Sequence, residues 1–250
     1  MKKNAYIIGG SGLIGYPLAL ELTNSYNVIV LDKKKIKNKK ISFISFDCSK
    51  LSNVEKNLKK IFINNGIPDV MVNCSYPVTS DWVDNSFDKV KYNSFKKNIE
   101  IHLNSYCWIS KIFADYMKKN KKSGSIVLLS SIYGVVGQSF NNYKNTNMKF
   151  NMTYPIIKSG IVGFIKQLAS YYGSNNIRIN SLAPGAIKGH VKGTKEIQNK
   201  NFIKNFSSRV PLKRLAKVDE IVKVIEFLLS DRASYITGQN ILVDGGYTAV

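Results

Sequence analysis

Short apolar runs alternate with longer segments of helical periodicity along the 250 residues. Buried parallel strands are almost continuously apolar, and the Ile-Val-Leu-Leu run at 126–129 has this pattern. The runs predict seven strands, at residues 5–8, 28–31, 41–46, 70–73, 126–129, 177–180 and 241–243. Helices are predicted between them, at residues 14–24, 51–64, 86–119, 153–172 and 219–229. This alternation predicts an α/β fold with a doubly wound parallel sheet.

No internal repeat or linker divides the chain, so we expect residues 1–250 to form a single domain. Two segments do not fit the alternation: 138–153, which is rich in asparagine, and 187–209, which is polar and rich in lysine. Loops of this length inside a compact domain are usually lids or binding loops. We therefore interpret both segments as insertions near a substrate site.

A glycine-rich turn, Gly9-Gly10-Ser11-Gly12-Leu13-Ile14-Gly15, connects the first predicted strand to the first predicted helix. In this context glycines allow a pyrophosphate to approach the backbone and the positive end of the helix. The turn therefore predicts a dinucleotide site, and a plain strand-to-helix turn is the alternative. The candidate cofactor contacts are Gly9, Ser11, Gly12, Leu13, Ile14 and Gly15.

Asp32 closes the second predicted strand and bears on the choice of cofactor. A carboxylate at this position accepts hydrogen bonds from the adenosine ribose and repels a 2′-phosphate, which favours NAD over NADP. Lys33 and Lys34 follow directly and can pair with such a phosphate. NAD is the predicted cofactor, and NADP is the less favoured alternative.

Tyr154 and Lys158 are four residues apart in a predicted helix, so both project from one face. A tyrosine ordinarily has a pKa of about 10, and lowering it to about 7 takes about 4 kcal/mol. We expect this only if Lys158 and the charge of a bound cofactor act together. Ser130 and Ser131 end the fifth strand, and ligands of open α/β sheets bind at this edge. These residues predict an acid–base site.

Together these motifs resemble the short-chain dehydrogenase/reductase family, and the resemblance extends from residue 5 to residue 247. Asn-Ser-Leu-Ala-Pro-Gly at 180–185 and Val-Asp-Gly-Gly at 243–246 follow in the family's order. The resemblance implies a Rossmann-type, seven-stranded fold in which Tyr154 is the acid/base and Ser131 polarises the substrate carbonyl. Lys158 would hold the nicotinamide ribose and lower the pKa of Tyr154. Ser130 is the alternative polarising group.

The resemblance also implies further site residues. Asp47 and Cys48 would contact the adenine, and Pro184 and Ile187 would flank the nicotinamide. Asn73 and Cys74, after the fourth strand, belong to the same cofactor set. His102 takes the place of an asparagine that holds a water beside Lys158. A histidine that only packs in the interior, or Asn104 in the asparagine's role, are the alternatives.

Several positions depart from the family's pattern. Leu13 replaces the usual middle glycine, a spacing closer to the extended branch of epimerases and dehydratases, whose extra C-terminal region has little room in 250 residues. The usual Asn-Asn-Ala-Gly is Asn73-Cys74-Ser75-Tyr76 here, and Gly189 stands where a threonine is common. A nucleotide-sugar epimerase or dehydratase and a non-catalytic dinucleotide-binding regulator are the alternatives to an oxidoreductase.

The insertion between Ser131 and Tyr154 bears on the substrate. Its asparagines and Tyr143 suit a polyhydroxylated ligand, and its sequence is similar to oxidoreductases of bacterial surface-sugar and flagellin-modification clusters, including legionaminic-acid pathways. A surface loop with biased asparagine content is the alternative. In the second insertion a set of basic residues can attract a phosphate or nucleotide-sugar: Lys188, Lys192, Lys195, Lys200, Lys204 and Arg209. The predicted substrate is a sugar, sugar-phosphate or nucleotide-sugar used in surface-glycan biosynthesis.

Composition limits the other classes of function. There are 37 Lys+Arg against 16 Asp+Glu, a net charge of +21, but lysine is spread along the whole chain, which argues against a nucleic-acid binder. Three cysteines without paired spacing argue against disulfides and metal sites and indicate a reducing compartment. No apolar run reaches the roughly 18 residues of a membrane span, and glycines interrupt the apolar stretch after Met1, so we expect a cytoplasmic protein. The resemblance implies a homodimer or homotetramer formed through segments 86–119, 153–172 and 241–243.

Overall fold

The computed structural model describes residues 2–189 and 198–250, and its centre is a seven-stranded parallel sheet in the order β3-β2-β1-β4-β5-β6-β7. The strands are β1 (Lys3–Ile8), β2 (Tyr26–Asp32), β3 (Ile41–Ser45), β4 (Val70–Asn73), β5 (Gly124–Leu129), β6 (Ile177–Pro184) and β7 (Asn240–Val243). Each predicted strand is present, and β4 matches its prediction residue for residue. The order reverses between β1 and β4, as in a doubly wound Rossmann-type sheet, which confirms the predicted fold class.

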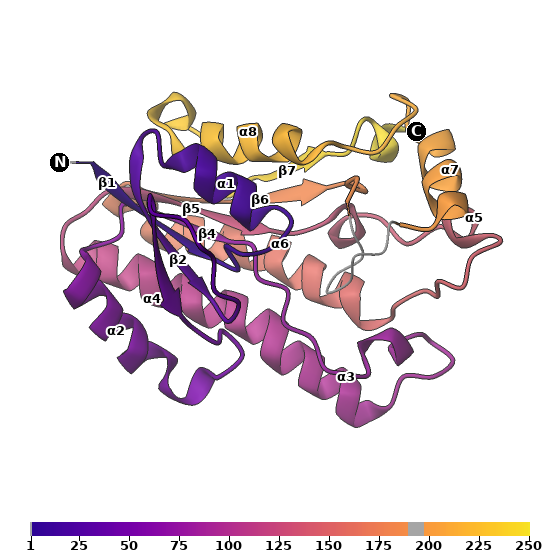
Figure 1. The fold of residues 1–250 in the computed structure, drawn as a ribbon, viewed down its shortest axis with the longest axis horizontal. Helices are drawn as coiled ribbons and strands as arrows, with labels where there is room; N and C mark the ends of the chain where they lie inside the picture. Colours follow the sequence, from indigo (N-terminus) through magenta and orange to yellow (C-terminus); the bar gives the residue numbers. More distant parts are fainter. Residues whose placement is uncertain (1, 190–197) are drawn as a thin grey trace.

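Helices cover both faces of the sheet (Figure 1). One face packs on α1 (Gly15–Leu22) and α8 (Val218–Leu229), and the other packs on α2 (Val54–Asn65), α4 (Ser105–Lys119) and α6 (Thr153–Tyr172). Alternate residues of β1 enter the two cores: Tyr6 and Ile8 on the α4 side, and Ala5 and Ile7 on the α1 side. Burial on both faces explains the continuously apolar strands. In the described parts of the chain, no helix is long and apolar enough to cross a membrane.

The helix predicted at 86–119 begins later and is interrupted. It consists of α3 (Tyr92–Asn98), a π-helical turn (Ile99–Asn104) and α4. Asn85 and the residues beside it are held outside the helix, because the Asn85 side-chain oxygen accepts a hydrogen bond from Thr153 Oγ1 at 2.7 Å. The Asn85 carbonyl also accepts the backbone N–H of Met152 at 2.8 Å. These contacts with the start of α6 override the local helical periodicity.

Both segments predicted as loops contain a helix. The first contains α5 (Phe140–Tyr143), and the second contains α7 (Lys200–Arg209). Asn199 caps α7 by accepting two backbone N–H groups, and Phe202 and Phe206, one turn apart, are its buried residues. The prediction of a continuous loop is therefore wrong for 140–143 and 200–209. Lys192 and Lys195, which we interpreted as anion-attracting, lie outside the described residues.

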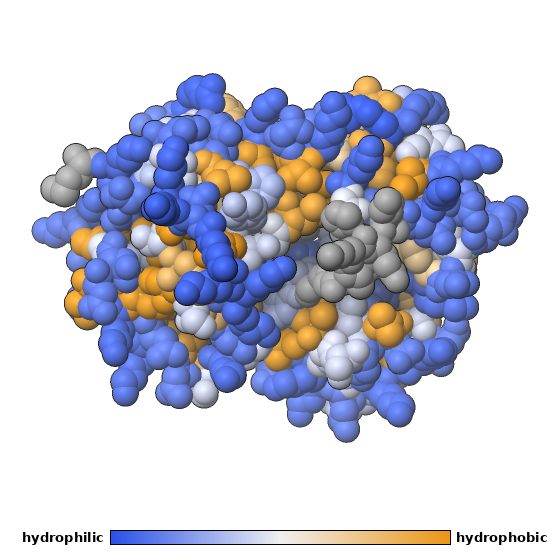
Figure 2. Space-filling view, in the orientation of Figure 1, coloured by the Kyte–Doolittle hydropathy of each residue, from blue (hydrophilic) through white to orange (hydrophobic). Residues whose placement is uncertain are grey.

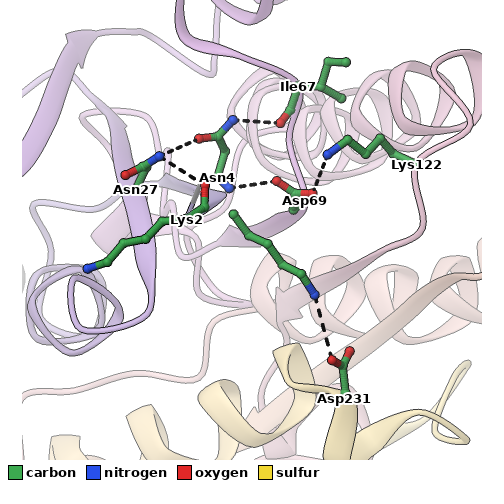
Figure 3. Close-up of polar contacts among 8 residues, drawn as sticks. Lys2, Asn4, Asn27, Ile67, Asp69, Lys122 and Asp231 are labelled. Carbon is green, nitrogen blue, oxygen red and sulfur yellow. Dashed lines mark hydrogen bonds and ion pairs between the residues drawn. The ribbon is translucent and has the colours of Figure 1, made fainter.

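Polar contacts connect neighbouring segments at the edge of the sheet where the strands begin (Figure 3). Asp69 accepts the backbone N–H of Asn4 at 2.8 Å and an ammonium hydrogen bond from Lys122 at 2.9 Å. The Asn4 amide donates to the Ile67 carbonyl at 3.1 Å, and Asn27 donates to the Asn4 side-chain oxygen at 3.4 Å. These contacts join β1 and β2 to the segments that lead into β4 and β5. The long connecting segments, and with them the candidate site, lie at the opposite edge.

Candidate active site

The glycine-rich turn between β1 and α1 is packed too closely for a side chain at its first and last glycines, Gly9 and Gly15. A Cβ on Gly15 would lie 2.2 Å from the Gly9 carbonyl oxygen, and one on Gly9 would lie 2.6 Å from Ser75 Cα. Gly9 also has a φ of +76°, which favours glycine. Gly9 and Gly15 therefore leave room for backbone only, and the turn at the start of α1 is a cradle of the kind that accepts a pyrophosphate.

Asp32 lies at the carboxyl end of β2 and joins this turn to the next loop. One carboxylate oxygen accepts the backbone N–H of Ser11 and the other that of Lys34, both at 3.0 Å. An ionised carboxylate has about four acceptor positions, so Asp32 can still accept ribose hydroxyls. The Lys33 ammonium lies 3.9 Å from a carboxylate oxygen of Asp47. Burial opposes ionisation of Asp47, but hydrogen bonds from Ser49 and the charge of Lys33 hold its pKa below the usual value.

The floor beside the turn consists of Asn73, Cys74, Ser75 and Cys48. The Asn73 side-chain oxygen accepts the backbone N–H and the hydroxyl of Ser75, at 3.1 and 2.7 Å. Its amide nitrogen is buried and has no hydrogen-bond partner within the described chain, so it is a donor that a bound dinucleotide could satisfy. Burial raises the pKa of Cys74 to about 12, so this thiol is neutral at physiological pH. The residues present fit a dinucleotide.

Two adjacent serines at the end of β5 make different contacts. The Ser131 hydroxyl is hydrogen-bonded to the Tyr154 side chain, at the start of α6. The Ser130 hydroxyl donates instead to the backbone carbonyl of Lys158, at 3.2 Å. Ser131 is therefore the serine that faces Tyr154, and Ser130 holds α6 against the sheet.

Lys158 lies one helical turn below Tyr154 and is 2% exposed. Its ammonium donates to the Leu129 carbonyl at 2.8 Å and lies 5.6 Å from the centre of the Tyr154 ring. The rings of Tyr106 and Tyr76 lie 5.2 and 5.8 Å from the same ammonium. Aromatic rings stabilise a buried cation at such distances.

The chain's own groups around Tyr154 shift its pKa upward. Burial raises it to about 12, and the hydrogen bond with Ser131, which lowers it, is the smaller effect. The expectation that Lys158 and the charge of a bound cofactor together lower this pKa stays a prediction; the ammonium donates to the Leu129 carbonyl and lies 5.6 Å from the centre of the Tyr154 ring. The phenol therefore holds its proton at neutral pH.

His102 is fully buried in the π-helical turn. The centre of its ring lies 5.0 Å from that of Tyr76 and 5.4 Å from that of Tyr106. These are the two rings that also surround the Lys158 ammonium. His102 therefore lies near Lys158, and both contact the rings of Tyr76 and Tyr106.

Three aromatic residues beside Tyr154 escaped the sequence reasoning. The ring centres of Tyr76, Trp82 and Tyr133 lie 5.9, 6.4 and 6.5 Å from that of Tyr154. Tyr76 could have been recognised from the sequence, because it stands where short-chain dehydrogenases/reductases usually have glycine. Trp82 could not, because its position depends on how residues 74–91 fold against α6.

The segment after β6 closes the site toward the glycine-rich turn. Pro184 is buried at the end of β6, and Ile187 forms an isolated bridge with Ala216. A Cβ on Gly189 would lie 2.8 Å from a methyl carbon of Leu13. The segment predicted to flank the nicotinamide therefore contacts the turn predicted to hold the pyrophosphate. Figure 2 shows a hollow near the middle of this face, with apolar surface above and below it.

Sequence comparisons agree with this geometry. The family described as Enoyl-(Acyl carrier protein) reductase matches residues 29–248. Post-translational flagellin modification protein A of Campylobacter coli is 28% identical, over 98% of each chain. A 3-oxoacyl-[acyl-carrier-protein] reductase FabG of Buchnera aphidicola subsp. Baizongia pistaciae is 32% identical, over 98% of this chain and 97% of the relative.

Solved structures are similar over nearly the whole chain. A short chain dehydrogenase from Leptospira borgpetersenii with bound NAD⁺ is 30% identical with a TM-score of 0.85, over 99% of this chain and 93% of that one. ElxO with NADP bound is 27% identical with a TM-score of 0.82, over all of both chains. The family match, the sheet order and the dinucleotide cradle agree. The chain belongs to the short-chain dehydrogenase/reductase family and is an oxidoreductase that acts on a CH–OH group with NAD(P).

Proposed function

We propose that this protein transfers hydride between NAD and a carbonyl or hydroxyl carbon of a sugar derivative. The observation that carries the proposal is the hydrogen-bonded Ser131–Tyr154 pair, with Lys158 buried one turn below it. This pair lies at the carboxyl edge of the sheet, which also carries the glycine-rich turn. When bound, the nicotinamide supplies or accepts the hydride.

In this proposal Tyr154 transfers the proton, and Ser131 and Lys158 assist it. Ser131 donates a hydrogen bond to the substrate carbonyl oxygen, and Tyr154 donates the proton to that oxygen as the carbon is reduced. The Lys158 ammonium offsets the negative charge left on the phenolate and binds the nicotinamide ribose. Burial raises the pKa of Tyr154 to about 12, so the tyrosine carries the proton that this step requires.

Asp32 supports NAD as the preferred cofactor. Two backbone N–H groups hold its carboxylate in place, so its negative charge would repel the 2′-phosphate of NADP. Lys33, which could offset that charge, pairs with Asp47 at 3.9 Å. NADP is the alternative, and structural relatives include proteins solved with either cofactor.

A sugar substrate is supported by the asparagine-rich segment 138–153 and by the similarity to a flagellin modification protein. Nδ2 of Asn201 and Nδ2 of Asn205, on α7, donate to backbone carbonyls of Asn145 and Lys144 at 2.8 Å. The two insertions therefore form one amide-rich unit. Such a unit offers hydrogen bonds to a polyhydroxylated ligand.

Reduction of a 3-oxoacyl thioester on an acyl carrier protein is the second candidate. It is favoured by the similarity to FabG, at 32% identity over 98% of this chain. The flat rings of Tyr76 and Trp82 beside Tyr154 suit a ring-shaped ligand better than an extended acyl chain.

A screen of NADH consumption tests the proposed function. Keto-sugars, keto-sugar phosphates and nucleotide-linked keto-sugars would be compared with acetoacetyl-N-acetylcysteamine, a soluble 3-oxoacyl thioester. We expect NADH consumption with a sugar ketone and its loss in Tyr154→Phe. Turnover of the thioester alone would support the second candidate. Sugar conversion without net change in NADH would indicate an epimerase or dehydratase, and NADH binding with no turnover of any compound would indicate a regulator.

We also propose that the protein is a homodimer or homotetramer. On the outer face of α6, Ile156 and Tyr171 are 43% and 60% exposed, and a Cβ on Gly163 would meet no atom within 4 Å. Leu242, on the edge strand β7, is 41% exposed. Sedimentation velocity should give a mass of two or four chains, and a concentration-independent monomer would contradict this.

A further inference from the structure

Two aromatic residues on the loop at 74–91 face the catalytic tyrosine. The Tyr76 ring lies 5.9 Å from the Tyr154 ring at 56°, and the Trp82 ring lies 6.4 Å away at 77°. Tyr76 and Trp82 are themselves perpendicular, with centres 5.9 Å apart. The two rings therefore pack edge to face as one cluster beside Tyr154, which we call the aromatic wall.

The aromatic wall is held in place by several contacts. The Trp82 indole N–H donates to the Tyr76 hydroxyl. The Asn151 side chain donates to the Trp82 carbonyl at 3.4 Å, and the Asn151 side-chain oxygen accepts the backbone N–H of Tyr154 at 2.8 Å. One asparagine thus ties the wall to the start of α6. A wall fixed in this way loses little conformational entropy when a ligand binds.

The groups around the wall combine aromatic faces with hydroxyls. Tyr133 lies 6.5 Å from Tyr154 on another side, and its hydroxyl is 3.3 Å from that of Tyr143. An aromatic face carries partial negative charge, which attracts the polarised C–H groups of carbons that bear oxygen. A saturated, hydroxylated ring presents such C–H groups on one face and hydroxyls at its rim. A flexible acyl chain has no comparable flat face.

We infer that Tyr76 and Trp82 are specificity-determining residues, which bind the C–H face of a carbohydrate ring and present one of its oxygenated carbons to Tyr154. This inference rests on the proposed function, since it concerns the same site. It adds that the aromatic wall, rather than the asparagine-rich segment alone, selects a ring over a chain. Tyr76 in place of the family's glycine is what builds this wall.

Tryptophan fluorescence gives a direct test, because the chain has only two tryptophans. Trp108 lies on α4, half-exposed, with the Lys111 ammonium 5.4 Å from its ring centre. Trp108→Phe leaves Trp82 as the only indole, and Trp82→Phe is the matched control that keeps Trp108. Each variant, saturated with NAD⁺, would be titrated with N-acetylmannosamine, UDP-N-acetylglucosamine and acetoacetyl-N-acetylcysteamine.

We expect at least one of the two ring compounds to change the Trp82 signal saturably in Trp108→Phe, with no saturable change in Trp82→Phe. The thioester should give no saturable change in either variant. Saturable binding of the thioester alone, or no response of Trp82 to either ring compound, would overturn the inference.

Kinetics separate substrate binding from a structural role. Tyr76→Ala and Trp82→Leu should each raise KM for a turned-over sugar at least tenfold while kcat changes less than about threefold. Tyr76→Phe should keep KM within about threefold, because it retains the ring. NAD⁺ affinity in each variant checks that the protein is folded. If Tyr76→Ala and Trp82→Leu instead lowered kcat and left KM unchanged, the aromatic wall would have no role in binding the substrate. A Trp82 response to ring compounds without turnover of any sugar would instead contradict the proposed function.

Discussion

At the end of β5, two adjacent serines have hydroxyls that point to different partners. Ser131 is hydrogen-bonded to the Tyr154 side chain, and Ser130 is hydrogen-bonded to a backbone carbonyl of α6. Neither contact can be read from the Ser-Ser pair in the sequence. The extended backbone at Ser131, with φ −164° and ψ 159°, directs the side chains of neighbouring residues to opposite sides.

This difference predicts opposite effects of two similar substitutions. Ser131→Ala should lower kcat by about 10²–10³-fold, the usual effect of removing one donor to a developing oxyanion. Ser130→Ala should keep kcat within about threefold and lower the free energy of unfolding by about 1 kcal/mol, because one buried hydrogen bond is lost. Steady-state kinetics and thermal unfolding measure both effects. The reverse pattern would make Ser130 the polarising residue.

The carboxylate of Asp32 likewise predicts a preference, for NAD(H) over NADP(H). NAD(H) should bind at least tenfold more tightly than NADP(H), a difference of about 1.4 kcal/mol. Asp32→Ser should reduce this difference by removing the repelling charge, and Lys33→Ala is the control for the neighbouring cation. Calorimetric titration of both cofactors gives the ratio. Equal or inverted affinities in the unmodified protein would show that the lysines dominate.

At the scale of elements, the sequence predicted the parts that depend on local pattern and on motifs. The seven strands and α6, which matches its predicted range 153–172, follow from continuous burial and periodicity. The glycine-rich turn and the Tyr154–Lys158 spacing were also recognisable. The start of α3 and the position of Trp82 were not, because Asn85 and Asn151 fix them through contacts with residues far away in the sequence.

Two other features were not predicted from the sequence. α7 was missed because Asn and Ser are weak helix formers, although the Asn199 cap and the Phe202–Phe206 spacing were available as signals. The raised pKa of Tyr154 depends on burial among residues distant in the sequence, such as Tyr76, Trp82 and Tyr133, which no local pattern reports.

The π-helical turn carries a prediction for His102. If His102 supports the proton supply of Lys158, His102→Asn should retain most activity, because an amide can also hold a water. This variant should lose the acidic limb of the pH–rate profile, since an amide does not titrate. His102→Leu should lose most activity while NAD⁺ binding is kept. Full activity in the leucine variant would leave His102 with a packing role only.

At the scale of the whole molecule, buried phenols predict a limit to alkaline stability. Burial raises the pKa of eight of the 14 tyrosines, namely Tyr6, Tyr26, Tyr76, Tyr106, Tyr133, Tyr143, Tyr154 and Tyr172. A pKa that is higher in the folded state gives stability that is complete below the unfolded value of about 10. This stability is lost as pH rises through the folded values, which for Tyr154 means about 12.

We therefore expect Tm to fall steeply above about pH 10. Tyrosinate absorbance should rise together with the loss of helical circular dichroism, because the buried phenols ionise as the chain unfolds. Complete tyrosinate formation before any loss of circular dichroism would show that these phenols are accessible in the folded state.

Tyr154→Phe, measured for turnover and for NADH affinity in the same preparation, tests whether Tyr154 is the general acid of an oxidoreductase. The substitution removes the proposed proton donor and changes little volume, and the Leu129 carbonyl still accepts a hydrogen bond from Lys158. Removing the general acid should lower kcat by at least about 10²-fold, while the Kd for NADH stays within about threefold of the unmodified protein. A Tyr154→Phe protein that binds NADH normally and keeps more than about a tenth of the original kcat would show that Tyr154 is not the proton donor.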